Sequence, residues 1–216
     1  MSLHYVSQKP RVASKNPPLM ILLHGLGSNE QDLFSFAPLL DPRYLIISVR
    51  APLSYGYGGY AWFNIDFSKG IPQPNIEEVQ QAQQQFSGVL DEIMQEFQPN
   101  VGHVYLVGFS QGAIMSYATA FTYPKKISGL VAMSGYILQE TTPSDGITSA
   151  HHDLKIFATH GTQDPVLPFF LGRSAADYLQ QHQFSYEFKE YAMAHEVNQA
   201  CFSDVKNWLD QRVADL

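Results

Sequence analysis

The chain has 216 residues, of which 45% are hydrophobic and 15% are charged. It is therefore long and apolar enough to bury a core without a metal or disulfide staple. Its 20 acidic and 13 basic residues give a formal net charge of −7, which argues against nucleic acid and anionic membranes as partners, because like charges repel. A single cysteine excludes an intramolecular disulfide and most cysteine-based metal sites.

The sequence shows no sign of export or of a membrane span. The segment Met1–Val12 lacks the apolar region of a secretory signal. The longest strongly apolar runs, such as Leu19–Leu23, are far too short to cross a bilayer. The length fits one domain over residues 1–216, and the cysteine content fits a reducing compartment. We therefore expect a soluble, cytoplasmic, single-domain protein.

Short aliphatic or β-branched runs alternate along the chain with longer helical patterns. Helical patterns fall between most of the strands, which is typical of βαβ units and predicts an α/β fold with a mostly parallel sheet. The predicted strands are Leu19–Leu23, Leu45–Val49, His103–Val107, Gly129–Met133, Lys155–Thr159 and Ser185–Glu190.

Two helices are especially clear. Apolar residues recur at spacings of three, four and seven over Ile76–Phe97, and Asn75 with Glu78 resembles an N-cap and its capping box. The last helix is predicted from about Val197 to Val213. It places Cys201 on its apolar stripe, which favours a buried structural thiol over a reactive one.

The segment Pro52–Asn75 stands apart, because it runs for 24 residues without helical or strand periodicity. Loops of this length in compact domains are usually functional or disordered, and six aromatic residues among four glycines argue against disorder. The segment is either a cap on one edge of the core or a wall of a binding site. If it is exposed, its aromatic residues can support a homodimer.

The sequence Gly108-Phe109-Ser110-Gln111-Gly112 matches the G-x-S-x-G pattern of a nucleophile elbow. It follows the predicted strand His103–Val107 and precedes a helical run. A tight corner between strand and helix needs small residues two before and two after the serine, and glycine fills both positions. Ser110 is therefore the candidate nucleophile, with the positive end of the next helix beneath it.

A serine hydroxyl needs a neighbouring base to take its proton, and in hydrolases with this elbow the chain order is serine, acid, histidine. That order favours His195, which lies in a turn between the predicted strand Ser185–Glu190 and the last helix. Asp164 follows the strand Lys155–Thr159 and is the candidate acid. Its expected role is to hold the His195 tautomer and to stabilise the imidazolium.

Two backbone N–H groups are expected to form the oxyanion hole. One belongs to Gln111, the residue after the candidate nucleophile. We assign the other to Leu26, because His24-Gly25-Leu26-Gly27 directly follows the strand Leu19–Leu23 and its glycines let the backbone approach a ligand. His24 is interpreted as an anchor of this turn without a catalytic role.

Together these motifs resemble the phospholipase/carboxylesterase family of α/β-hydrolases, which includes bacterial carboxylesterases and acyl-protein thioesterases. The resemblance runs from about residue 18 to 210. It implies a minimal three-layer αβα hydrolase fold without a lid domain, and activity on carboxylic esters, with thioesters or lysophospholipids in some members. The chain departs from the family pattern at Ala192 and Ala194, where proline and glycine are frequent, and at Ala113, where glycine is frequent. The motifs are Leu23-His24-Gly25-Leu26-Gly27, Trp62-Phe63, the elbow, His160-Gly161-Thr162-Gln163-Asp164 and His195-Glu196.

We therefore expect a serine carboxylesterase that acts through an acyl-enzyme and needs no metal or organic cofactor. Its partner is expected to be a small-molecule neutral ester with a small to medium acyl group, without stable insertion into a membrane. Apolar residues proposed to line the substrate site are Trp62, Phe63, Leu167 and Met193, with Tyr55, Tyr57 and Phe169 as further candidates.

Three other functions stay open to different degrees. A thioesterase or lysophospholipase would use the same triad. A non-catalytic binding protein on the hydrolase fold is disfavoured, because every triad position is filled. A metal-dependent hydrolase is disfavoured as well, because the sequence has no H-E-x-x-H motif.

Overall fold

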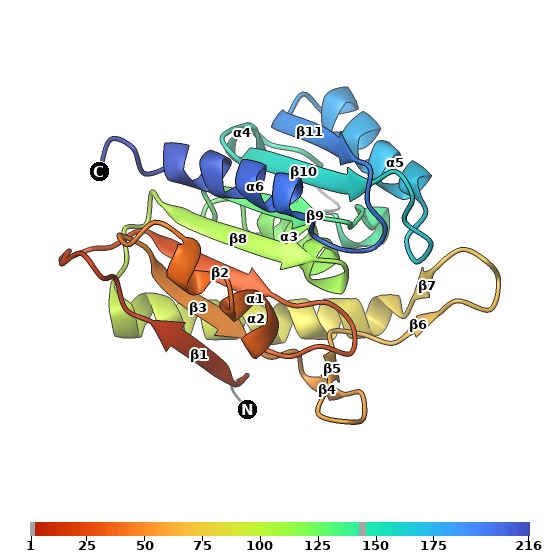
Figure 1. Ribbon diagram of the computed structural model, residues 1–216, viewed down its shortest axis with the longest axis horizontal. Helices are drawn as coiled ribbons and strands as arrows, with labels where there is room; N and C mark the ends of the chain where they lie inside the picture. Colours follow the sequence, from red (N-terminus) through yellow and green to blue (C-terminus); the bar gives the residue numbers. More distant parts are fainter. Residues whose placement is uncertain (1–2, 143–145) are drawn as a thin grey trace.

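A seven-stranded sheet forms the centre of the computed structural model, which describes residues 3–142 and 146–216 (Figure 1). The strand order is β1-β3-β2-β8-β9-β10-β11, and all neighbours pair in parallel except β1, which is antiparallel to β3. The mostly parallel sheet is thus confirmed. The strands are β1 (Tyr5–Gln8), β2 (Leu19–Leu23), β3 (Leu45–Val49), β8 (Val104–Phe109), β9 (Gly129–Met133), β10 (Lys155–Gly161) and β11 (Ser185–Tyr191).

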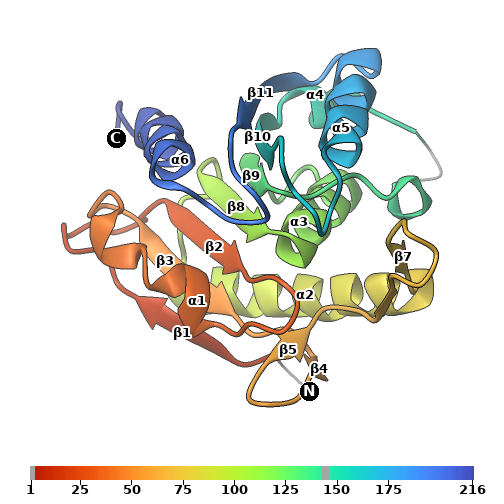
Figure 2. The same ribbon diagram turned by 45° about the vertical axis from the view of Figure 1, so that its right-hand side comes forward.

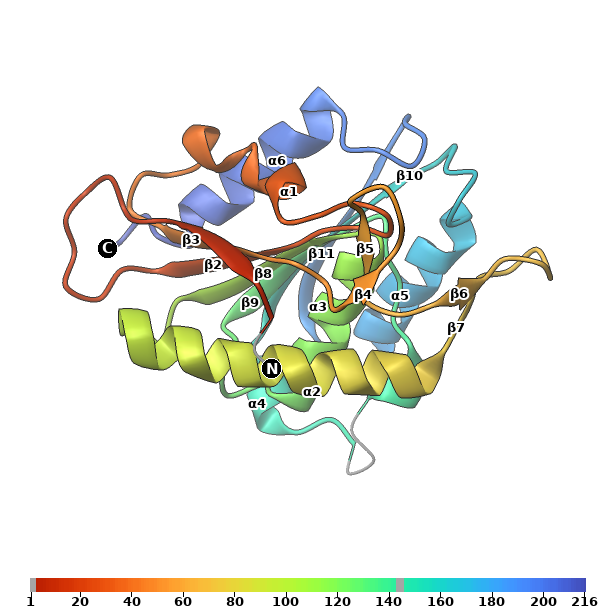
Figure 3. The same ribbon diagram turned by 90° about the horizontal axis from the view of Figure 1, so that it is seen from below.

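Helices cover both faces of the sheet, so the molecule has three layers (Figure 3). One face carries α1 and α6, and the other carries α2, α3 and α5. The helices are α1 (Gln31–Phe34), α2 (Ile76–Phe97), α3 (Gln111–Thr122), α4 (Ser149–His152), α5 (Phe169–Gln181) and α6 (Gln199–Gln211), with 3₁₀ turns at Ala37–Leu39 and Gln139–Thr141.

The helices on both faces of the sheet explain why a central strand such as β2 is apolar at every position. In β2, Leu19, Ile21 and Leu23 pack toward α2 and α3, whereas Met20 and Leu22 pack toward α1 and α6. A central parallel strand is covered on both faces, so it is apolar at every position instead of at alternate ones. All five residues of β2 are buried.

The last helix buries the single cysteine, as its position on the apolar stripe predicts. Cys201 is fully buried, and its Sγ donates to Thr159 Oγ1 at 3.4 Å. Burial raises the pKa of the thiol, which keeps it protonated and chemically quiet.

The segment from residue 52 to 75 contains two short antiparallel pairs that the sequence did not predict. They are β4 (Leu53–Ser54) with β5 (Tyr60–Ala61), and β6 (Ile65–Asp66) with β7 (Gln73–Pro74) (Figures 1 and 2). Strands of two residues are too short to show a period of two. The β6–β7 hairpin projects beyond the carboxyl edge of the sheet (Figure 1).

The start of α2 fastens this segment to the fold. Asn75 caps the helix as predicted, because its Oδ1 accepts from the backbone N–H of Glu78 at 3.3 Å. The reciprocal half of the capping box is wrong. The Glu78 carboxylate instead accepts from the backbone N–H and side-chain amide of Asn64, at 2.6 and 3.0 Å. Glu78 therefore ties the base of the β6–β7 hairpin to α2.

In the described part of the chain, no helix is both long and apolar enough to span a membrane. Parallel strands end at one edge of a sheet, and the segments after β2, β8, β10 and β11 meet there. The turns before α5 and α6 reach over the end of β8 (Figure 2). The fold therefore gathers the candidate functional residues at one place.

Candidate active site

Ser110 lies on a sharp turn between β8 and α3. Its backbone has φ +55° and ψ −118°, a conformation that residues with side chains rarely adopt. A Cβ atom on Gly108 would overlap the backbone of Gly112, and one on Gly112 would overlap the carbonyl of Leu23. The two glycines therefore allow the turn, and the turn presents the serine hydroxyl at the carboxyl edge of the sheet.

The structure brings Ser110, His195 and Asp164 together from three separate loops. His195 Nε2 lies 2.9 Å from Ser110 Oγ, and His195 Nδ1 lies 2.6 Å from Asp164 Oδ2. A carboxylate only accepts, so Nδ1 carries the proton, and Nε2 is free to accept from the serine hydroxyl. The ring of Phe109 lies 4.9 Å from the imidazole and helps to hold it.

Asp164 is buried and held by the turn that follows it. Its Oδ1 accepts from the backbone N–H groups of Val166 and Leu167 at 2.9 and 2.8 Å. Burial alone would raise the pKa of this carboxyl. The hydrogen bonds from His195 and the two amides outweigh burial and hold the pKa below its ordinary value. Asp164 is therefore ionised in the neutral pH range.

A second buried histidine supports the same turn. His160 Nε2 donates to the carbonyl of Leu167 at 2.8 Å and lies 3.6 Å from Asp164 Oδ2. Burial lowers the pKa of His160, so this imidazole is neutral in its setting. It holds the turn that carries Asp164 and has no contact with Ser110.

The two expected oxyanion donors line the same cleft as Ser110. The backbone N–H groups of Leu26 and Gln111 donate to no acceptor in residues 3–142 and 146–216, so both are free for a ligand. His24 anchors the turn before Leu26 as predicted. It is buried, and its Nε2 accepts from the backbone N–H of Ala51 at 3.1 Å.

The Gln111 side chain links the elbow to residues 62 and 63. Its Oε1 accepts from the Trp62 N–H at 3.0 Å, and its Nε2 donates to the Phe63 carbonyl at 2.8 Å. Trp62 Nε1 in turn donates to the carbonyl of His24 at 2.9 Å. One hydrogen-bonded chain therefore connects both halves of the candidate oxyanion hole. Sequence reasoning assigned Gln111 only a backbone role and missed this contact.

An ion pair between buried Glu30 and partly exposed Arg50 stabilises the loop after β2 from the other side. Glu30 accepts two hydrogen bonds from Arg50, both at 2.6 Å. These bonds lower the pKa of Glu30 to about 2, although burial opposes the shift. The Arg50 guanidinium also stacks over the ring of Tyr60, 4.6 Å from its centroid.

The cleft above Ser110 has a volume of about 250 Å³. Most of the apolar residues in its wall were not predicted from the sequence. They come singly from a hairpin, a helix and a turn, so they form no recognisable sequence pattern. The lining residues are Gly25, Leu26, Ser28, Asp32, Ile65, Phe67, Phe109, Ser110, Gln111, Ile114, Val166, Leu167 and His195.

Three of the four proposed substrate-binding residues are wrong. Leu167 lines the cleft, but Trp62 and Phe63 are fully buried in the core next to α2, and Met193 is buried on the opposite face of the sheet. Of the further candidates, Tyr55 and Tyr57 are exposed on the β4–β5 hairpin, and Phe169 does not line the cleft either. Trp62 and Phe63 are therefore core residues that pack the interior, and they do not line the substrate cleft.

Comparison with known proteins identifies the family of this chain. The model of the family described as phospholipase/carboxylesterase matches residues 8–213. The chain belongs to this family. Acyl-protein thioesterase 1 of Kluyveromyces lactis is 28% identical over 93% of this chain and 96% of its own length. A probable SOBER1-like carboxylesterase of Arabidopsis thaliana is 28% identical over 90% of this chain and 78% of its own.

Solved structures of esterases share the α/β-hydrolase fold of this chain. The esterase PE8 superposes with a TM-score of 0.82 at 23% identity, covering 97% of this chain and 98% of that one. The Bacillus cereus carboxylesterase superposes with a TM-score of 0.81 at 22% identity, covering 97% and 94%. The three-layer fold predicted from the sequence is confirmed.

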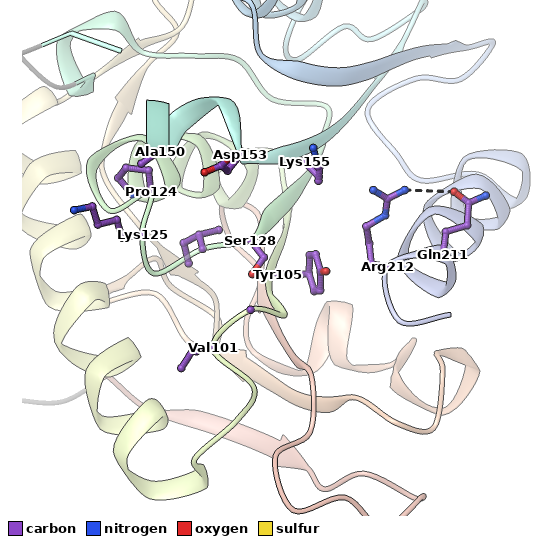
Figure 4. Close-up of a pocket in the computed structure, with 12 residues that line it drawn as sticks. Val101, Tyr105, Pro124, Lys125, Ser128, Ala150, Asp153, Lys155, Gln211 and Arg212 are labelled. Carbon is purple, nitrogen blue, oxygen red and sulfur yellow. Dashed lines mark hydrogen bonds between the residues drawn. The ribbon is translucent and has the colours of Figure 1, made fainter. Parts of the chain in front are cut away.

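A larger hollow of about 640 Å³ lies at the opposite, amino-terminal edge of the sheet (Figure 4). Its labelled residues include Lys125, Lys155 and Arg212, with Asp153 among them. Lys125 follows the C-cap of α3, and Arg212 is the C-cap of α6, so both cations lie close to the negative ends of helices. None of the triad side chains lines this hollow. Ser110 and His195 line the cleft at the carboxyl edge of the sheet instead.

Proposed function

We propose that this protein is a serine carboxylesterase that hydrolyses neutral carboxylic esters with small to medium acyl groups. The observation that carries the proposal is the position of the His195 ring between Ser110 Oγ and Asp164 Oδ2, at 2.9 and 2.6 Å. Membership of the phospholipase/carboxylesterase family supports the same reaction class.

In the first step, Ser110 Oγ attacks the ester carbonyl carbon while His195 Nε2 takes the hydroxyl proton. Asp164 stabilises the imidazolium that forms, and it stays ionised. The carbonyl oxygen becomes an oxyanion, which the free amides of Leu26 and Gln111 bind. The intermediate collapses when His195 returns the proton to the leaving alcohol, and the acyl group remains on Ser110.

In the second step, water replaces the alcohol. His195 takes a proton from the water, which attacks the acyl carbon, and the same two amides bind the second oxyanion. Collapse breaks the bond to Ser110 Oγ, which recovers its proton from His195. The carboxylic acid leaves and the enzyme is restored. The chain's own residues supply every proton transfer, so the proposed mechanism uses no cofactor.

The cleft supports a substrate of limited size. Ile65, Phe67, Ile114, Val166 and Leu167 give it an apolar wall, and its volume of about 250 Å³ suits a small to medium acyl group. No lysine or arginine among the described residues lines it, so it offers no cationic side chain to a polyanion.

The decisive experiment compares the wild-type protein with Ser110→Ala. The variant should lose about 10⁴- to 10⁶-fold in turnover of a short-chain ester, because it lacks the nucleophile. A fluorophosphonate probe should label the wild type at Ser110, since only an activated serine reacts. Near-normal hydrolysis by Ser110→Ala, or no labelling of the wild type, would sink the proposal and favour a non-catalytic binding role.

A second candidate is an acyl-protein thioesterase or lysophospholipase that uses the same triad. It is supported by the thioesterase name of the 28% identical yeast relative. A panel of esters and thioesters graded by acyl length separates the two. Rates that rise steadily toward long-chain thioesters would favour this second function, whereas a maximum at short esters supports the carboxylesterase.

We also propose that the protein works in the cytoplasm. Its single cysteine is buried and unpaired, which suits a reducing compartment. Fractionation of cells that produce the tagged protein tests this location.

A further inference from the structure

The candidate catalytic cleft has two unlike sides. The β6 strand, α3 and the turn after Asp164 contribute apolar side chains, whereas the loop after β2 contributes Ser28 and Asp32. In Figure 2, the end of β8 lies between α1 and the hairpin that carries β7. An ester bound at Ser110 extends in two directions, as an acyl group and an alcohol group, so the two sides offer different surroundings to its two halves.

Asp32 brings a negative charge that no nearby cation neutralises. Its Oδ2 accepts from Ser28 Oγ at 2.6 Å, while its Oδ1 has no hydrogen-bond partner among residues 3–142 and 146–216. It makes no ion pair in that part of the chain, and none of the cleft's lining residues is a lysine or arginine. The other acid of this loop, Glu30, is buried and bound to Arg50.

The position of Asp32 in α1 does not remove this charge. Asp32 lies in the first turn of a four-residue helix, where an acidic residue interacts favourably with the free N–H groups. That interaction explains why an acid is tolerated there. A helix of one turn has only a small dipole, so the carboxylate still acts on whatever occupies the cleft.

We infer that Asp32 is a specificity-determining residue, which makes the enzyme prefer esters whose alcohol half is cationic over neutral ones, and neutral ones over anionic ones. The inference rests on the proposed esterase function and refines its substrate class: neutral esters remain substrates, and esters with a cationic alcohol half react faster. A cleft of about 250 Å³ keeps a charge on the alcohol within several ångströms of Asp32. At that range and in a largely aqueous setting, one charge changes kcat/KM by about three- to tenfold.

The experiment uses three butyrate esters that differ mainly in the charge of the alcohol. Butyrylcholine carries a positive charge, 3,3-dimethylbutyl butyrate is its neutral isostere, and 3-sulfopropyl butyrate is anionic. The quantity measured is the ratio of kcat/KM values within one variant, so a change in overall rate or in the folded fraction cancels. The wild type should favour the cationic over the neutral ester by about three- to tenfold at low salt, and 0.5 M salt should reduce that ratio.

Asp32→Asn should bring the ratio of cationic to neutral ester close to one, and Asp32→Glu should keep it. Asp32 is exposed, and in the described part of the chain its carboxylate is bonded only to Ser28, so Asp32→Ala is a second neutral variant that should behave like Asn. Asp177→Asn is the matched control, since it changes the net charge equally on an exposed face of α5 outside the cleft.

Two results would overturn the inference. One is an unchanged ratio in both Asp32→Asn and Asp32→Ala. The other is an equal loss in Asp177→Asn, which would assign the preference to the overall charge of −7. Failure of the proposed function looks different, because none of the three esters would then be hydrolysed and Ser110 would not be labelled.

Discussion

At the scale of single residues, the site depends on which nitrogen of His195 carries the proton. Asp164 decides this, because its buried carboxylate accepts from Nδ1 at 2.6 Å. Its pKa is already below the ordinary value, since the bonds from His195 and the amides of Leu167 and Val166 outweigh burial. The acid therefore orients and stabilises the imidazole without taking its proton.

Replacing Asp164 with asparagine should keep the shape of the turn but remove the acceptor that selects the tautomer. We expect kcat for a short-chain ester to fall about 10⁴-fold, by analogy with the same change in other triads. The matched control is Asp153→Asn, an exposed aspartate at the other edge of the sheet. Steady-state kinetics of both variants test the assignment, and equal losses in the two would contradict it.

At the scale of elements, the loop after β2 is held at both ends. His24 bonds to Ala51 after β3, and Glu30 bonds to Arg50 beside it. Both contacts are made to residues that follow the neighbouring parallel strand. The loop that offers the Leu26 amide and Asp32 is therefore fixed to the sheet.

The Glu30–Arg50 pair gives stability a defined pH dependence. The folded pKa of Glu30 is about 2 and its unfolded value is 4.5. A depressed pKa means that the stabilisation is fully present above pH 4.5 and is lost as pH falls toward 2. Glu30→Gln should lower the free energy of unfolding by about 2 kcal/mol at pH 7, a figure reduced from the full shift because Arg50 is partly exposed.

Urea unfolding of wild type and Glu30→Gln between pH 2.5 and 7 measures this difference. It should be constant above pH 5 and shrink steadily below pH 4.5. Glu187→Gln serves as the control, because Glu187 is exposed on β11 with no ion pair in the described residues. A difference that stays constant down to pH 2.5 would show that Glu30 is not held by its charge.

At the scale of the whole molecule, repeated patterns were predictable and isolated contacts were not. The helix Ile76–Phe97 and the strands β2, β3 and β9 have the predicted bounds, because each repeats one kind of side chain over several turns or positions. The antiparallel edge strand β1 was missed. It spans four residues, of which none is fully buried, and leaves no apolar run.

The candidate site follows the same division. Ser110, Asp164 and His195 were predictable because chain order and the carboxyl ends of parallel strands restrict where they can lie. The apolar wall of the cleft was not predictable, since it depends on where single side chains point. Trp62 sits in the core beside Phe86, whereas Phe67, five residues later, lies at the cleft and is 42% exposed. No pattern within Pro52–Asn75 distinguishes the two.

This difference between Trp62 and Phe67 can be measured directly. Trp62→Ala empties a fully buried site and leaves the carbonyl of His24 without its donor, so it should lower the free energy of unfolding by about 3–5 kcal/mol. Phe67→Ala should lower it by less than about 1 kcal/mol, because Phe67 is already 42% exposed in the folded protein. The opposite pattern is expected in kinetics. Phe67→Ala should raise KM for a medium-chain ester several-fold, since it removes part of the apolar wall. Trp62→Ala is to be tested well below its Tm, where it is folded. There it should change KM less than it changes kcat. A large stability loss in Phe67→Ala with an unchanged KM would place this ring in the core and Ile65 alone at that wall.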